Sequence, residues 1–149
     1  MLVAADGYAK IADFGLSKEN IVGHNEAKSM CGTAAYLAPE IILRQGHGKA
    51  ADWWSFGGII YEMLCGQPPF YNKDKEKLFK NIKYSEPRLD FPFLSEDARD
   101  LCSKLLDKNP QSRLGSGETD AQEIMTHPWF ATIDWNTIYE KKHTAPYIP

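Results

Sequence analysis

Two tripeptides hold the residues of this sequence that are best suited to chemistry, Asp13-Phe14-Gly15 and Ala38-Pro39-Glu40. The stretch between them has no sustained hydrophobic period, and irregular segments of that length in compact domains are usually functional or disordered. The carboxylate of Asp13 is a hard oxygen ligand of the kind that Mg²⁺ prefers. An aspartate at the end of a strand can also simply cap a turn, so the residue type alone leaves both interpretations open.

The elements that must position these tripeptides are mostly helical. Asp6-Gly7 is a strong hairpin signal, and it predicts a strand over residues 2–4 and a returning strand over residues 8–12. Apolar spacing, N-cap residues and proline or glycine stops predict four helices further on. These are residues 51–65, 74–82, 95–108 and 120–126, followed by an extended tail from Ala131 onward.

Composition limits the classes of protein to which the chain can belong. Its 149 residues fit one domain or part of a larger one, and 43% hydrophobic with 25% charged residues argues against disorder. A net charge of −3 gives no electrostatic reason to expect a nucleic acid partner. The most apolar stretch, residues 53–65, is shorter than a bilayer requires and contains Glu62, so we expect a buried helix and no transmembrane segment. Three dispersed cysteines favour reduced thiols and a cytoplasmic, or else nuclear, location.

The two tripeptides together, at this spacing, belong to the protein-kinase signature, in which an activation-loop phosphosite lies between them. The chain also contains IADFGLSKEN, CGTAAYLAPE, ADWWSFGGIIYEMLCGQPPFYNKDKEKLF and RLGSGETDAQEIMTHPWF. With these stretches it resembles the C-terminal lobe of a eukaryotic serine/threonine protein kinase of the AGC group, in the protein kinase B and serum/glucocorticoid-regulated kinase branch.

This resemblance implies a protein-kinase-like α+β fold. The chain is then the mainly α-helical C-terminal lobe with a short N-terminal β-hairpin and without the N-lobe. Residues 1–130 are expected to form a partial protein kinase domain, and residues 131–149 the start of the AGC-kinase C-terminal extension.

The resemblance implies roles for several residues of the long segment. Asp13 holds the Mg²⁺ that bridges the phosphates of ATP, Phe14 packs into the core and orients Asp13, and Gly15 allows the turn. Ser29 corresponds to the activation-loop phosphosite, although an exposed loop serine is the plain alternative. Thr33 corresponds to a residue that supports the catalytic loop and helps to select serine or threonine as acceptor.

Four residues outside the metal site are also assigned by the resemblance. Glu40 and Arg113 are expected to meet as a buried ion pair that ties the activation segment to the helical lobe. Asp52 is expected to anchor the lobe by bonding the catalytic-loop backbone, and by its position it is also a candidate N-cap. Glu62 corresponds to a position that contacts basic residues of the substrate peptide, and a polar helix end is an equally good interpretation.

A complete kinase also needs a Gly-rich loop, the β3 lysine and its glutamate partner, and an HRD catalytic loop. The sequence contains none of these motifs. We therefore expect a serine/threonine kinase by family, with basic-residue protein substrates and an upstream activating kinase, but a fragment that is inactive alone. The alternative is a non-catalytic kinase-lobe module that binds or regulates partners. Either way, helix 51–65 is expected to be partly uncovered, so that the chain exposes apolar surface and tends to aggregate.

Overall fold

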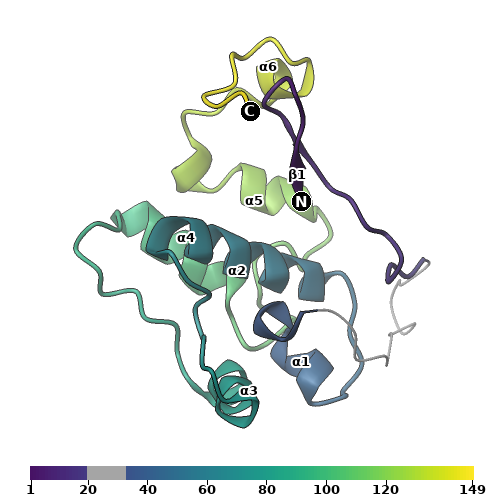
Figure 1. Cartoon of the computed structure of the whole chain (residues 1–149), viewed down its shortest axis with the longest axis vertical. Helices are drawn as coiled ribbons and strands as arrows, with labels where there is room; N and C mark the ends of the chain where they lie inside the picture. The colour runs from purple at the N-terminus through teal and green to yellow at the C-terminus, as the bar shows by residue number, and fades with distance from the viewer. Residues whose placement is uncertain (20–32) are drawn as a thin grey trace.

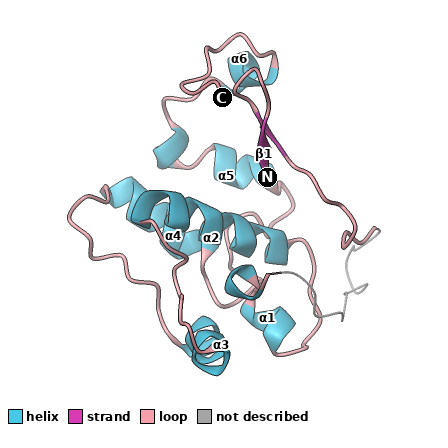
Figure 2. Ribbon diagram, viewed as in Figure 1, coloured by secondary structure: helices cyan, strands magenta, loops and turns pink. Residues whose placement is uncertain are grey.

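The computed structural model describes residues 1–19 and 33–149. Within these ranges the chain is mainly helical with one two-stranded antiparallel sheet (Figure 2), which confirms the fold class expected from the sequence. The elements are β1 Leu2–Val3, β2 Ala9–Lys10, η1 Ala34–Tyr36, α1 Pro39–Ile42, α2 Ala50–Cys65, α3 Lys75–Tyr84, α4 Glu96–Leu105, α5 Ala121–Met125, η2 Pro128–Phe130 and α6 Trp135–Tyr139.

Helix α2 is the centre of the fold (Figure 1), and α4 packs along it. The two helices approach closely at Gly57, where an added Cβ atom would lie 2.7 Å from Cβ of Leu105. A side chain at position 57 would therefore force the helices apart. Helix α2 ends at Gly66, whose φ of 83° is the left-handed conformation that glycine adopts most readily.

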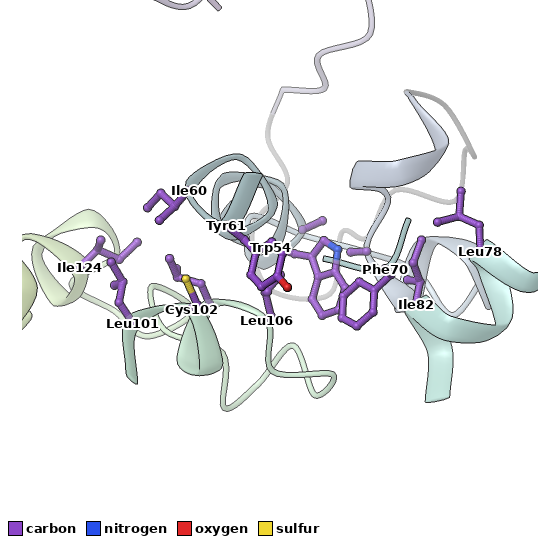
Figure 3. Close-up of a cluster of buried hydrophobic side chains, with 13 residues drawn as sticks. Trp54, Ile60, Tyr61, Phe70, Leu78, Ile82, Leu101, Cys102, Leu106 and Ile124 are labelled. Atoms are coloured by element: carbon purple, nitrogen blue, oxygen red, sulfur yellow. The ribbon is translucent and has the colours of Figure 1, made fainter. Parts of the chain in front are cut away.

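The core fills the space around α2. Figure 3 shows Trp54 beside Phe70, and their rings stack with centroids 5.6 Å apart. Around this pair, side chains from α3, α4 and α5 complete one cluster that includes Ile82, Leu101 and Ile124. Because a helix that is apolar on most sides must be covered by protein, the buried position predicted for residues 51–65 follows from their composition.

Side-chain caps fix the beginnings of two helices that pack on this core. The Ser95 hydroxyl accepts a hydrogen bond from the Ala98 amide at the start of α4, as predicted from the sequence. The Asp74 carboxylate accepts hydrogen bonds from two amides in the first turn of α3. Each cap satisfies N–H groups that would otherwise lack a partner.

The start of α2 differs from the prediction. Its N-cap is Lys49, and Asp52 lies inside the first turn, so the interpretation of Asp52 as an N-cap is wrong. Residues before position 52 already have helical geometry, because Ala50 and Ala51 are good helix formers and are both buried. An acidic side chain in this first turn still complements the positive end of the helix.

The two ends of the chain also differ in detail from the prediction. The hairpin is present, but β1 and β2 are only two residues long, with Leu2 opposite Lys10 and Val3 opposite Ala9. An isolated two-stranded hairpin is only marginally stable, and all four strand residues here are exposed. The tail is not wholly extended, because Asp134 caps the short helix α6 through the amides of Asn136 and Thr137. A helix of five residues is too short to show a hydrophobic period in the sequence.

None of the helices in the described ranges is long and apolar enough to cross a membrane.

Candidate functional site

The Asp13-Phe14-Gly15 segment begins three residues after the end of β2 and is irregular and exposed. Asp13 has a φ of 68°, a left-handed conformation that is uncommon for residues other than glycine, although aspartate tolerates it better than most. The chain then turns, with the amide and hydroxyl of Ser17 both donating to the carbonyl oxygen of Phe14. Residues in such uncommon backbone conformations concentrate at functional sites, so the φ of Asp13 supports a functional role for its carboxylate.

Phe14 does not pack into the core as predicted. Its side chain is 66% exposed, so within the described residues nothing holds it in the position that would orient Asp13. The physical reason is the path of the chain: Figure 1 shows this segment separate from the helical ribbons, and Ile11 and Leu16 beside it are equally exposed. An apolar ring buries itself only where other side chains supply a covering surface.

The proposed phosphosite Ser29 lies outside the described residues, as do Cys31 and Gly32 at the start of the CGTAAYLAPE stretch. The description resumes at Thr33, which is exposed and immediately precedes η1. Its carbonyl oxygen accepts a hydrogen bond from the Tyr36 amide, while its hydroxyl makes no capping hydrogen bond to that helix.

Tyr36 was not identified from the sequence, and it positions Glu62. The Tyr36 hydroxyl donates a short hydrogen bond to Oε2 of Glu62, which raises the pKa of the tyrosine above its ordinary value. The Tyr36 carbonyl oxygen in turn accepts a hydrogen bond of 2.9 Å from the Ser55 hydroxyl on α2. The half-buried Glu62 carboxylate is thereby held in one direction, with its second oxygen left for another donor. The only signal for this contact in the sequence is a general one: a partly buried tyrosine hydroxyl needs a polar partner.

Glu40 and Arg113 are brought together although they lie 73 residues apart. Nη1 and Nη2 of Arg113 donate to the two carboxylate oxygens of Glu40 over 2.7 Å and 3.0 Å, and both side chains are buried. The same guanidinium donates to the carbonyl oxygens of Ala50 and Asp107, and it lies 5.1 Å from the ring centroid of Trp54. Arg113 thus ties α1 to the start of α2 and to the loop after α4, with nearly all its donors satisfied.

Asp52 is exposed in the first turn of α2, and its side chain makes no hydrogen bond to the residues that the structure describes. Partial desolvation by the surrounding protein raises the pKa of its carboxyl above the ordinary value, while His47 acts in the opposite direction. A carboxylate without a partner in this position remains able to accept hydrogen bonds from a further backbone segment.

Asp13 is the carboxylate best placed to meet a cation, but it stands by itself. Within residues 1–19 and 33–149 no three of the histidine, cysteine, aspartate and glutamate side chains gather as a metal site. Its exposed oxygens fit a Mg²⁺ ion that takes most of its ligands from water and phosphate, because this ion is usually bound through only one or two carboxylates. The structure gives no hydrogen bond or ion pair from Asp13 to the other site residues in the ranges it describes.

These features define a helical lobe in which a long segment begins at the exposed carboxylate of Asp13 and ends at the buried ion pair between Glu40 and Arg113. The protein kinase domain model matches residues 1–130. The chain is 46% identical over its whole length to RAC-beta serine/threonine-protein kinase B of Xenopus laevis and to ribosomal protein S6 kinase beta of Caenorhabditis elegans. It is 43% identical to protein kinase C-like 2 of Schizosaccharomyces pombe.

The chain belongs to the protein kinase family, and its relatives place it in the AGC group of serine/threonine kinases. It spans 30% of the length of the Xenopus relative, 27% of the Caenorhabditis one and 15% of the fission yeast one.

Proposed function

We propose that this chain supplies the metal-binding and substrate-facing part of a serine/threonine protein kinase that transfers the γ-phosphoryl group of ATP to proteins. The observation that carries the proposal is the buried ion pair between Glu40 and Arg113. This pair attaches the C-terminal end of the segment that begins at Asp13 to the helical lobe. A segment anchored in this way can present a substrate to a metal-bound nucleotide from a fixed platform.

Each site residue has a definite task in this function. Mg²⁺ bound with ATP neutralises charge that develops on the phosphates, and Asp13 holds that ion through its exposed carboxylate. Glu62, oriented by Tyr36, offers its second oxygen to an arginine or lysine of the substrate protein. Thr33 supports the acceptor side of the site. Ser29 is the residue on which an upstream kinase acts, adding charge of about −1.5 to −2 to the segment.

The chain by itself is expected to transfer no phosphate. Its residues include one metal ligand, but no HRD aspartate to accept the proton of the substrate hydroxyl and no lysine of a Gly-rich-loop lobe to hold the phosphates. A positioned carboxylate without these groups cannot assemble the in-line geometry that phosphoryl transfer needs.

A non-catalytic binding module is the second candidate, and one observation favours it. Large apolar side chains are more than half exposed along residues 1–16, namely Met1, Leu2, Val3, Ile11, Phe14 and Leu16. Several large exposed apolar side chains in one segment commonly mark a contact with another protein segment. In the kinase hypothesis that segment belongs to the remainder of the same catalytic domain, whereas in the second it belongs to a partner.

The experiment compares the 149-residue chain with the protein isolated from its own cells, each incubated with Mg²⁺, labelled ATP and an arginine-rich serine peptide. We expect transfer by the isolated native protein, loss of that transfer in its Asp13→Asn form, and no transfer by the 149-residue chain. An Asp90→Asn form is the control, since that exposed carboxylate pairs only with Arg88.

Two results would contradict the proposal. Phosphate transfer by the 149-residue chain would show that the missing motifs are not required. A native product of 149 residues that transfers nothing and captures a discrete partner through residues 1–16 would favour the binding module.

A further inference from the structure

The C-terminal segment of the chain lies against the β1–β2 hairpin at its N-terminus. Figure 1 shows the end of the chain, in yellow, beside the hairpin, in purple. The contacts join residues separated by 135 positions, so they are tertiary and not a consequence of chain connection. They involve residues 138–147 on one side and Asp6, Gly7 and Tyr8 on the other.

Lys141 and Tyr8 make the polar part of this contact. Nζ of Lys141 lies 2.5 Å from Oδ2 of Asp6 and 5.3 Å from the centroid of the Tyr8 ring. The Tyr8 hydroxyl donates a 2.6 Å hydrogen bond to the carbonyl oxygen of His143. One ammonium group therefore holds both the acidic turn and the aromatic ring of the hairpin.

Close packing at Gly7 makes the contact specific. Gly7 has a φ of +82°, and an added Cβ atom would lie 2.3 Å from the Tyr147 carbonyl oxygen and 2.5 Å from Cβ of Ala145. A small cavity of about 160 Å³ lies beside it, lined by residues 7–9 of the hairpin together with Ile138, His143, Ala145 and Pro146. The tail is thus fitted to a surface that only glycine leaves open.

The backbone at Lys141 belongs to the end of α6. Its φ of 56° is left-handed, and the amides of Lys142 and His143 close the turn by donating to the carbonyl oxygen of Thr137. The hairpin, by contrast, depends on this tail: within the described ranges, no hydrogen bond or ion pair joins residues 1–19 to the rest of the protein except those to Lys141 and His143. All four strand residues of the hairpin are exposed.

We propose that residues 138–147 form a strap that fixes the β1–β2 hairpin, and that Lys141 and Tyr8 are positioning residues for Asp13. Asp13 follows the last residue of β2 by three positions, so the hairpin sets its place to within about 10 Å, the reach of three extended residues. The proposal rests on the proposed function, because it gives the tail a task in placing the metal-binding carboxylate.

The test uses the 149-residue chain with three variants. Lys141→Met removes the ammonium group and keeps the stem, and Tyr8→Phe removes only the hydroxyl. Lys142→Met is the matched control, since that lysine makes the same charge change next door and pairs only with Glu140. Amide hydrogen exchange and amide chemical shifts are measured across the chain, with exchange of α2 and α4 reporting that each variant is folded.

We expect Lys141→Met and Tyr8→Phe to speed exchange of the Ala4 and Gly7 amides by about two- to five-fold. Both amides are hydrogen-bonded in the hairpin. The amide shifts of residues 11–15 should move too, although neither substituted side chain touches them, whereas a purely local role in the tail would change only residues 131–149. Lys142→Met should match the wild type throughout. Unchanged exchange and shifts over residues 4–15 in both test variants, or equal changes in the control, would overturn the strap.

A titration of the wild-type chain with Mn²⁺ alone separates this inference from the proposed function. Broadening of the Asp13 and Gly15 amides is expected if the Asp13 carboxylate binds the ion. Its absence would count against the metal role of Asp13, while the exchange comparison would still decide whether the strap holds the hairpin.

Discussion

Arg113 is among the largest fully buried side chains of the described residues, and its charge is met by Glu40. A buried ion pair of this kind costs desolvation energy to form, so it is weak evidence for net stability. The pair instead fixes relative positions, because the guanidinium binds Glu40 in the first turn of α1, the first residue of α2 and the loop before residue 113 at the same time. Breaking it should therefore loosen the attachment of the segment that ends at Glu40.

Substitution of either partner should be strongly destabilising, by about 3–5 kcal/mol, because the remaining charge stays buried without a partner. Arg113→Met should cost more than Glu40→Gln, since it also leaves the Ala50 and Asp107 carbonyl oxygens unpaired. Urea unfolding measures both. Arg88→Met is the control, because its pair with Asp90 is solvent-exposed and should be worth little. Losses as small as the control would show that the pair is not isolated from water.

Lys108 is half-buried, and its buried Nζ atom has no hydrogen-bond partner among the described residues. Its Nζ lies 3.9 Å from the centroid of the Phe70 ring and 4.9 Å from that of Trp54. Burial lowers the pKa of this amine from 10.5 to about 8, with Glu86 opposing the shift and Arg113 adding to it. The charged form is therefore less stable in the folded chain than in the unfolded one.

Lys108→Met should raise the free energy of unfolding at pH 7 by about 1–3 kcal/mol, because it removes a desolvated charge and keeps the packing. The sign of the pH dependence follows from the lowered pKa. Below pH 8 the penalty is fully present in the wild type, and it disappears as the pH rises from about 8 to 10.5. The advantage of the variant should shrink over that interval, as measured by urea unfolding at each pH. A gap that stays constant, or one that Lys77→Met reproduces on the exposed face of α3, would refute this account.

At the scale of elements, the α2–α4 contact is the most extensive contact between two helices of the described residues. Gly57 and Gly58 are neighbours in α2, but they differ in what surrounds them. A Cβ atom at position 57 would lie 2.7 Å from Cβ of Leu105, whereas one at position 58 would meet only the Tyr36 ring at 3.4 Å. Alanine at position 57 therefore reports the cost of crowding between the helices, whereas alanine at position 58 reports mainly the gain in helix propensity.

Gly57→Ala should destabilise the chain by about 1–3 kcal/mol, because α4 must move away from α2. Gly58→Ala is the matched variant, and it should be neutral or gain up to about 1 kcal/mol from the better helix propensity of alanine. Thermal and urea unfolding give both values. Equal effects of the two substitutions would mean that the helices are free to separate at Gly57.

Local signals in the sequence predicted most elements, and the exceptions have physical causes. Ser95 and Gly66 mark helix ends by their own chemistry, so α2 and α4 were predicted within a residue or a few of their observed bounds. The exposure of Phe14 depends on what covers it, which no local pattern reports. The hydrogen bond of Tyr36 to Glu62 depends on the packing of η1 against α2, and nothing in the spacing of the two residues indicates it.

At the scale of the whole molecule, the N-terminal segment exposes several large apolar side chains. Leu2 and Ile11 are 62% and 73% exposed, and Ile11 lies close in the chain to the exposed Phe14 and Leu16. The prediction from the sequence was that helix 51–65 is partly uncovered, and α2 does leave Met63 79% exposed and several other side chains only partly buried. The segment that leads into Asp13 adds a second set of exposed apolar side chains, so we expect it to take part in any aggregation of the chain.

The double substitution Leu2→Lys with Ile11→Lys should therefore reduce self-association of the 149-residue chain while leaving its free energy of unfolding within about 0.5 kcal/mol. Light scattering against concentration measures the first quantity and urea unfolding the second. Tyr139→Lys is the matched control, because that aromatic side chain is 90% exposed on α6, outside the N-terminal segment. It should leave self-association unchanged, since single apolar side chains scattered on a surface are normal. Equal improvement from the control would show that association depends on net charge alone and that residues 2–16 are not a contact surface.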